Sequence, residues 1–174
     1  RVDIDRNQRF SQVDDQVAAG RKLYDRRMQP MQLGIDAETM EMAFQVMVDG
    51  NLDNTDADFD GKYFASTCYN SEMGMNLGEM ISSERDHVVV FSLAACEAAV
   101  KAGKFKTYNG NNVPVLDGRK GSDLTRYIPV PKSPHGLNTS PNGEYFIANG
   151  KLSPTVSIIS IKKLDALFAN KIKP

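Results

Sequence analysis

Two similar stretches, 82 residues apart, constrain the fold more than any other feature of the sequence. "DFDGKYFASTCYN" (58–70) and "SPNGEYFIANG" (140–150) each join an Asp-Gly or Asn-Gly turn to a charged residue, two aromatic residues and a strand. This order is typical of a β-hairpin. Each stretch is followed by a β-branched strand, "DHVVVFSL" or "TVSIISI", and then by a short helical segment. The sequence therefore predicts two tandem units of the same order.

Short strands, glycine turns and the lack of a long helical pattern predict an all-β fold, an incomplete β-propeller of about three blades with short helical insertions. The turn glycines Gly61 and Gly143 are separated by about twice the roughly 40 to 50 residues of one propeller blade. We therefore expect a shorter module containing "GRKGSDLTRYIPVP" between the two units. Apolar residues alternate from Met40 to Val48, which predicts a further half-buried strand.

Composition limits the partners of the chain. Its formal net charge is -1 over 174 residues, which gives nucleic acid and anionic membranes no broad electrostatic attraction. Apolar runs such as "VVVFSLAAC" are too short to span a bilayer. Residues 1–33 are polar and suggest at most a weak helix, whereas residues 34–174 carry the strand patterns and form the expected propeller domain. We interpret the chain, which does not begin with Met, as a piece of a longer protein.

A lone histidine, His135, lies between Pro134 and Gly136. Proline biases the preceding Ser133 toward an extended backbone and glycine permits a tight one. We therefore expect the imidazole on a stiff elbow, where a strand ends at the inner rim of a blade. Imidazole is a common ligand of copper and zinc. Most lone histidines are hydrogen-bonded surface or core residues, so the local residues leave both a metal ligand and a structural role open.

Two acidic segments offer oxygen ligands to a hard cation such as Ca2+. One runs from Glu72 to Asp86, and the other, "VDGNLDNTDADFDG", carries five aspartates. Neither has EF-hand spacing, and a solvated loop or turn formation is the simpler interpretation of each. His87, at the start of "HVVVF", is predicted to be a strand residue. Cys68 and Cys96 lie in apolar contexts and are predicted to be buried free thiols.

Longer strings add a family resemblance: "IDAETMEMAFQVMVDGNLDNTDADFDGKYFASTCYNSE", "ERDHVVVFSLAACEAAVKAGKFKT", "TRYIPVPKSPHGLNTSPNGEYFIANGKLSPTVSIISI" and "KLDALFANKIKP". From about residue 34 to residue 174, they closely resemble the propeller domain of nitrous oxide reductases. The resemblance implies a periplasmic homodimer in which each subunit joins a seven-bladed propeller to a cupredoxin domain. It also implies a tetranuclear copper-sulfide cluster bound by seven histidines, and a dinuclear copper site that lies outside this chain.

The resemblance assigns roles to two residues near the cluster. His135 of "SPHG" matches a copper ligand, and Asp53 of "GNLDN" matches the carboxylate that orients a cluster histidine. The implied reaction is the two-electron reduction of N2O to N2 and water, with electrons from a cytochrome c or a cupredoxin. A single histidine cannot assemble the cluster, so the activity would belong to the full-length protein and the fragment alone would be inactive.

The resemblance also implies a calcium site. The family's calcium positions fall on Tyr69 and Glu72 of "YNSE", on Met80, and on Asp86 of "ERDH". Tyr69 and Met80 would offer backbone carbonyls, which suit a hard cation. Ser133 stands where some members of the family have an asparagine as a further ligand. The alternative to an enzyme fragment is a non-catalytic β-propeller, a binding or structural module with a calcium site.

Overall fold

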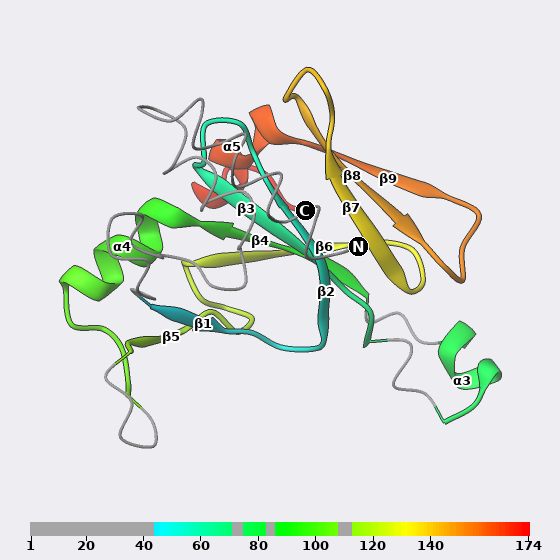
Figure 1. The fold of residues 1–174 in the computed structure, drawn as a ribbon, viewed down its shortest axis with the longest axis horizontal. Helices are drawn as coiled ribbons and strands as arrows, with labels where there is room; N and C mark the ends of the chain where they lie inside the picture. Colours follow the sequence, from blue (N-terminus) through cyan, green and yellow to red (C-terminus); the bar gives the residue numbers. More distant parts are fainter. Residues whose placement is uncertain (1–43, 71–74, 83–85, 108–112) are drawn as a thin grey trace, which may run out of the picture.

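The computed structural model describes residues 44–70, 75–82, 86–107 and 113–174, in which short strands predominate (Figure 1). The strands are β1 (Gln45–Met47), β2 (Leu52–Ala57), β3 (Tyr63–Cys68), β4 (His87–Ser92), β5 (Val115–Asp117), β6 (Thr125–Pro129), β7 (Pro134–Thr139), β8 (Tyr145–Gly150) and β9 (Val156–Ser160). The helical segments are α3 (Leu77–Ser82), α4 (Leu93–Lys101), the 3-10 turn η3 (Ile161–Lys163) and α5 (Leu164–Phe168). Within these ranges no helix combines the length and the apolar character that crossing a bilayer requires.

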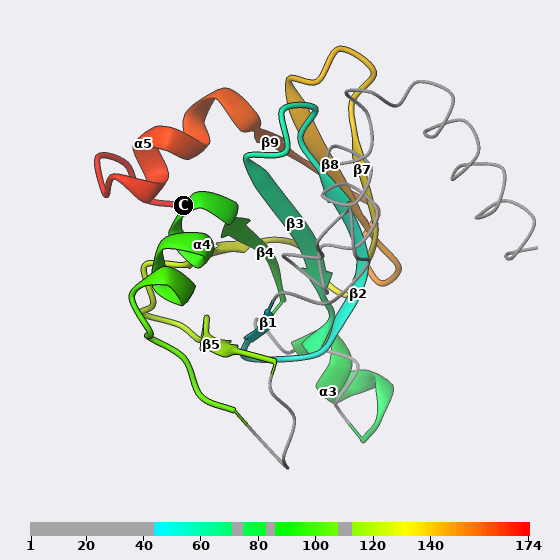
Figure 2. The ribbon, with the colours of Figure 1, turned by 60° about the vertical axis from the view of Figure 1, so that its left-hand side comes forward.

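Two antiparallel sheets dominate the structure. The first has the strand order β2-β3-β4-β6, and the second has the order β7-β8-β9. β1 and β5 form a small parallel pair beside the first sheet (Figure 1). Figure 2 shows α4 and α5 toward the left of the view and α3 at the lower right. The predicted strand-rich architecture with antiparallel sheets is confirmed.

The two tandem units predicted from the sequence are present and closely matched. β2 and β7 begin 82 residues apart and have the same length, as do β3 and β8. Both hairpin turns use the same hydrogen bond, because the amide of Gly61 donates to Asp58 O (3.1 Å) and that of Gly143 donates to Ser140 O (2.8 Å). Both glycines have a positive φ, +64° and +72°, a conformation that glycine adopts at little steric cost.

The units differ in one connection, and this difference positions the site described below. The link from β8 to β9 covers residues 151–155, whereas the link from β3 to β4 covers residues 69–86 and contains α3. After β4 and β9, the third strands of the two units, the hydrogen bonding of the units matches again. The amide of Leu93 at the start of α4 donates to Lys62 O (3.2 Å), and that of Ile161 at the start of η3 donates to Glu144 O (2.9 Å).

The expectation of a separate module between the two units is wrong. The segment "GRKGSDLTRYIPVP" supplies β6, which pairs with β4 as the fourth strand of the first sheet. The large spacing between the turn glycines has a different cause. The first unit carries the long connection with α3, and α4, β5 and β6 follow its third strand before the second unit begins.

β3 and β4 are buried on both faces, and this places the core between stacked layers. Alternate residues of a strand point to opposite faces, so a strand covered on both sides is a continuous apolar run such as "VVVF". One face packs against β5 and α4, in a cluster that includes Phe44, Phe64, Val89, Phe91, Cys96 and Leu116. The other face packs against the second sheet, in a cluster that includes Tyr63, Val88, Val90, Leu137, Phe146 and Ile159. The two sheets therefore pack face to face, with the second cluster between them.

The predictions for the amino-terminal part fall partly outside the described residues. The predicted weak helix of residues 1–33 lies outside them, as does the beginning of the strand predicted from Met40 to Val48. The remainder of that strand corresponds to β1, in which Val46 packs against the core and Met47 is exposed. The helical segments predicted after each third strand are α4 and η3 with α5.

Candidate metal-ligand site at His135

His135 is the extra residue of an irregularity at the start of β7. Pro134 lies opposite Gly150 and Gly136 lies opposite Asn149, so the register shifts at His135. A β-bulge of this kind bends the strand and redirects the side chain of the inserted residue. The expected position at the end of a strand is wrong, because His135 is the second residue of β7 and the chain enters the strand there.

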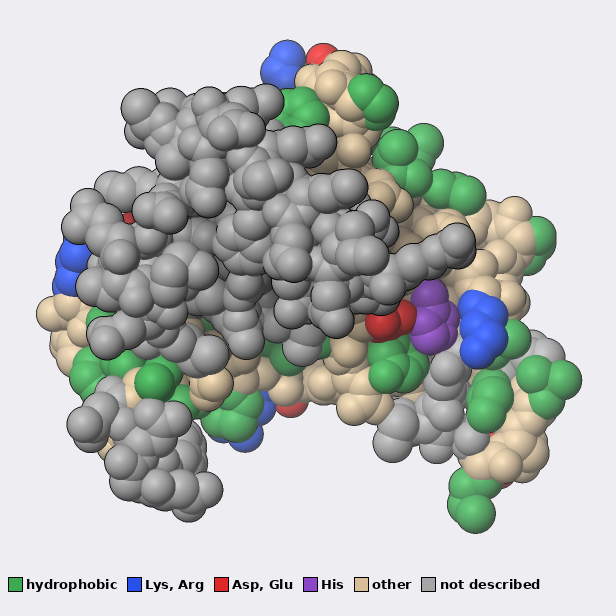
Figure 3. All heavy atoms as spheres, in the orientation of Figure 1, with side chains coloured by type: hydrophobic (Ala, Val, Ile, Leu, Met, Phe, Trp, Pro, Cys, Tyr) green, Lys and Arg blue, Asp and Glu red, His purple; other side chains and the backbone are tan. Residues whose placement is uncertain are grey.

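Asp53 occupies the equivalent position in the first unit and contacts His135. It is the second residue of β2, and β2 has a register shift between Leu52 and Thr55. The carboxylate oxygen Oδ2 of Asp53 hydrogen bonds to Nδ1 of His135. Both side chains are partly open to solvent, and Figure 3 shows an imidazole at the surface beside an acidic and a basic side chain. Two corresponding bulges thus bring an acid and an imidazole together.

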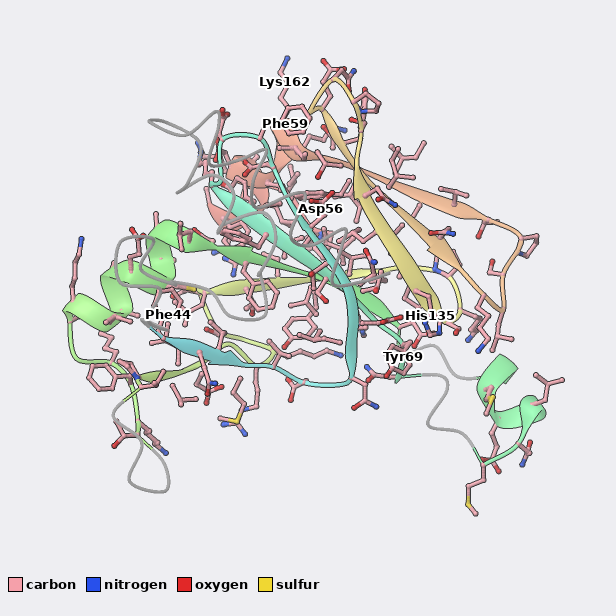
Figure 4. The ribbon with its side chains drawn as sticks, in the orientation of Figure 1. Phe44, Asp56, Phe59, Tyr69, His135 and Lys162 are labelled. Carbon is pink, nitrogen blue, oxygen red and sulfur yellow. The ribbon has the colours of Figure 1, made fainter. Side chains whose placement is uncertain are left out.

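The ring of Tyr69 stacks on the imidazole of His135. The ring centroids are 4.9 Å apart and the planes differ by 21°, which is within the range of attractive aromatic stacking. Figure 4 shows the two labelled side chains at the same edge of the sheets. Close by, the hydroxyl of Thr67 donates to His135 O at 3.3 Å. Tyr69, just after β3, therefore contacts the ring of His135, and Thr67 of β3 contacts its backbone.

Polar side chains of β2 and β7 join the two sheets along these strands. Three contacts run from a side chain to the backbone: Asn54 Oδ1 accepts from Leu137 N (3.0 Å), Asp56 Oδ2 accepts from Thr139 N (2.7 Å), and Thr139 Oγ1 donates to Ala57 O (2.7 Å). The partners advance together along both strands, so β2 and β7 run in the same direction. The interpretation of this acidic segment as turn formation is wrong for Leu52–Ala57, which is strand β2. The sequence reasoning assigned none of these contacts between the sheets. Their one signal was a strand, "LDNTDA", with unusually many polar residues.

The elbow before His135 exists, but its backbone differs from the prediction. Ser133 is fully buried and has a φ of +54°, so it is left-handed rather than extended. Its amide donates to the carboxylate Oδ2 of Asp86 at 2.6 Å, and its carbonyl accepts from Lys151 N at 2.8 Å. These two hydrogen bonds override the preference that the following Pro134 imposes. Gly150 permits the close approach, since a Cβ there would lie 2.5 Å from Lys132 O.

Apart from Ser133, which precedes β7, the residues predicted for calcium belong to the β3–β4 connection. Tyr69 begins the connection and Asp86 ends it. Asp86 is buried and contacts Ser133, as described above. Met80 is on α3, which Figure 1 shows apart from the sheets. Glu72 lies outside the described residues.

The remaining candidate groups, one histidine and two cysteines, are buried in the structure. His87 is a buried residue of β4 with its ring edge-on to Tyr127 (centroids 5.8 Å apart), as predicted for a strand residue. Cys68 and Cys96 are buried free thiols, also as predicted. Burial raises the pKa of Cys68 to about 11 and that of Cys96 to about 12, so neither is an ionised nucleophile at neutral pH. Within the described part of the chain, no three His, Cys, Asp or Glu side chains form a metal-binding group.

The geometry at His135 suits a metal ligand that needs partners from elsewhere. An acceptor at Nδ1 selects the tautomer with the proton on Nδ1, and the lone pair of the neutral ring is then on Nε2. Ligating histidines commonly bind a carboxylate through their other ring nitrogen, because this fixes the tautomer and raises the basicity of the ligand atom. The site therefore offers one oriented imidazole, which is a single ligand and not a complete centre.

Comparisons with known proteins identify the family. Residues 14–54 match the nitrous oxide reductase propeller repeat 2, a match that begins upstream of the expected domain start at residue 34. The chain is 64% identical over 155 residues to a nitrous-oxide reductase of Pseudomonas fluorescens, covering 87% of this chain and 24% of that protein. It is 62% identical over 154 residues to the nitrous-oxide reductase of Stutzerimonas stutzeri, covering 86% and 24%.

A more distant relative gives the same result. A nitrous-oxide reductase of Cupriavidus necator is 47% identical over 143 residues, covering 79% of this chain and 22% of that protein. The chain thus spans about a quarter of the length of the relatives it matches. The chain belongs to the nitrous oxide reductase family and represents part of its propeller region.

Proposed function

We propose that the chain is part of a copper-dependent enzyme that reduces N2O with two electrons and two protons to N2 and water. The observation that carries the proposal is the orientation of His135, whose Nδ1 is held by Asp53 at two matched bulges. The names of the relatives support the reaction. Copper accepts imidazole ligands readily, so the residues present fit the proposed metal.

In this proposal His135 contributes one imidazole to a four-copper sulfide cluster, and the other six histidines come from the rest of the longer protein. The cluster, when bound, would pass on electrons received from the donor and would offer coordination positions to a poorly reactive substrate. Asp53 holds the proton on Nδ1 and so leaves the lone pair of Nε2 for the metal. At this position the role of the protein is to orient one copper ligand.

The proposed whole protein is a seven-bladed propeller of which this chain supplies about three blades. The face-to-face packing of the two antiparallel sheets and the common direction of β2 and β7 support this arrangement, since the blades of a propeller radiate around a central channel. We further propose a periplasmic homodimer with a cupredoxin domain that holds a dinuclear copper site. A cytochrome c or a cupredoxin would deliver the electrons.

We also propose a calcium site in the β3–β4 connection. Its ligands would be backbone carbonyls of Tyr69 and Met80 with the carboxylates of Glu72 and Asp86, a set of oxygen donors that suits Ca2+. The side chain of Ser133 would be a further member of this set, next to Asp86, which accepts from the Ser133 amide. Calcium would tie the two ends of the connection together beside His135.

The test of the copper proposal is the substitution His135→Ala in the full-length protein. Supporting partners of ligands typically contribute about 10- to 100-fold in metal affinity or activity, so loss of the ligand itself should lower N2O reduction at least about 100-fold. Consumption of N2O with a reduced viologen dye and copper per protein measure the effect. Asn138→Ala, at an exposed position of β7, is the control. A wild-type protein that binds calcium but neither binds copper nor reduces N2O would favour the non-catalytic propeller.

A further inference from the structure

We propose that Tyr69 is a positioning residue whose aromatic face sets the plane of the His135 imidazole. The inference rests on the proposed function, in which His135 is a copper ligand. It assigns to the side chain of Tyr69 a role separate from that of its backbone carbonyl in the calcium proposal. The contact that motivates it is the stacking of the two rings, with centroids 4.9 Å apart and an interplanar angle of 21°.

The hydrogen bond from Asp53 is not sufficient to orient the ring. An imidazole turns about two side-chain torsions, and a single contact at Nδ1 fixes one point on its edge. Rotation about the line through Nδ1 and the carboxylate oxygen would still swing Nε2 through an arc. A stacked ring restricts this rotation because it fixes the plane. Asp53 and Tyr69 together therefore determine the direction of the Nε2 lone pair.

Tyr69 is well anchored for this role. It directly follows β3, whose residues are all buried. Its amide donates to Asn51 O at 3.2 Å, just ahead of β2, the strand that carries Asp53. Two residues before it, Thr67 holds His135 O. The phenol ring, the carboxylate and the backbone contact thus approach His135 from one rigid hairpin.

The inference depends on the flat face of Tyr69, and this can be separated from its hydroxyl. In the full-length protein, Tyr69→Phe keeps the ring and Tyr69→Leu removes it while keeping an apolar side chain. We expect Tyr69→Leu to lower copper affinity about 10-fold, the lower end of the effect of groups that orient a ligand. Tyr69→Phe should leave the affinity unchanged. Competition with a graded copper chelator, with copper measured by elemental analysis and visible absorption, gives the affinity without turnover.

The outcomes distinguish this inference from the proposed function. A wild-type protein that binds no copper contradicts the proposed function. A copper-loaded wild type with unchanged affinity in Tyr69→Leu contradicts only the role of the ring, as does equal loss in Tyr69→Phe and Tyr69→Leu. Calcium content and the melting temperature of the copper-free protein separate a local effect from loss of the fold. If Tyr69→Leu lowers the melting temperature, Tyr69→Met is the second non-aromatic variant, and unchanged copper affinity in it overturns the inference.

Discussion

At the scale of single residues, the backbone before His135 is held in a costly conformation. A left-handed, non-glycine residue costs on the order of 1 to 3 kcal/mol and persists only where the surroundings enforce it. Ser133 is such a residue, and its two backbone hydrogen bonds come from Asp86 and Lys151, which belong to different segments. The position of His135 is therefore coupled to the end of the long β3–β4 connection.

Asp86 allows the structural contact and the proposed calcium contact to be tested separately. Asp86→Asn keeps an oxygen acceptor for the Ser133 amide but removes the charge, so we expect lower calcium content with little loss of stability. Asp86→Ala leaves a buried amide without its acceptor, which costs about 1 to 3 kcal/mol. It should therefore also lower the melting temperature of the full-length protein and make the backbone at Asp86 more accessible to protease. Calcium content equal to that of the wild type in both variants would contradict the calcium proposal.

How much of the site the sequence could predict depends on the range of the interactions. The proline and glycine around His135 mark an elbow through local chemistry alone. The left-handed Ser133 could not be predicted, because its cause is a carboxylate 47 residues earlier in the chain. The stacking of Tyr69 on His135 and the contacts of Asn54 and Asp56 likewise depend on how two sheets meet. No local pattern encodes that approach.

At the scale of elements, the paired hairpins explain why the tandem units were predictable. Turn, aromatic pair and strand recur with the same spacing, and both turns form the same hydrogen bonds. β6 was not predictable in the same way. Its sequence contains turn formers and an alternating strand, and only its pairing with β4 shows that it completes the first sheet. Local sequence was enough to predict that this segment forms a strand, but not to predict which sheet the strand joins.

Arg126 of β6 clamps the carboxyl end of α5 and so joins the two units. Its guanidinium donates to Leu167 O (3.3 Å) and Phe168 O (2.9 Å), and it lies over the Phe168 ring at 4.8 Å. A cation at the end of a helix also complements the helix dipole.

Replacing Arg126 should weaken the association of the two units. Hydrogen bonds from a charged group contribute about 1.5 to 3 kcal/mol, so Arg126→Met should lower the unfolding free energy of the full-length protein by about 2 kcal/mol. Arg126→Lys should recover only part of this, because an ammonium group lacks the planar fork. Denaturant unfolding measures the change, with Lys163→Met, at an exposed position, as the control. A smaller effect for Arg126→Met than for the control would show that the clamp does not stabilise the protein.

At the scale of the whole molecule, a second contact between the units predicts a pH dependence. Asp165 of α5 forms an ion pair with Lys62 and accepts a hydrogen bond from the Tyr63 hydroxyl (2.5 Å). The Lys62 hydrogen bond, followed by that of Tyr63, lowers the pKa of Asp165 below its ordinary 3.8. Because the pKa of Asp165 is lower in the folded protein, this contact contributes its full stabilisation above pH 3.8, the ordinary pKa of the carboxyl group. The contribution is lost as the pH falls through the lowered pKa of the folded state.

The variant Asp165→Asn removes this titration. The melting temperature of the full-length protein should therefore fall less steeply between about pH 4 and pH 3 in the variant than in the wild type. Because the pair is exposed, the difference should be small and should shrink in high salt. Asp60→Asn, at an exposed position of the turn between β2 and β3, is the control. Parallel curves for the wild type and Asp165→Asn would contradict the prediction.

The last strand of the second sheet has a consequence for handling the protein. β9 pairs with β8 on one side and ends the described sheet, and its Val156 and Ile158 side chains are 56% and 66% exposed. A strand at the edge of a sheet that exposes apolar side chains can pair with strands of other molecules. Expressed without the remainder of its polypeptide, this piece should self-associate into insoluble aggregates, so recombinant work on the site calls for the complete coding sequence.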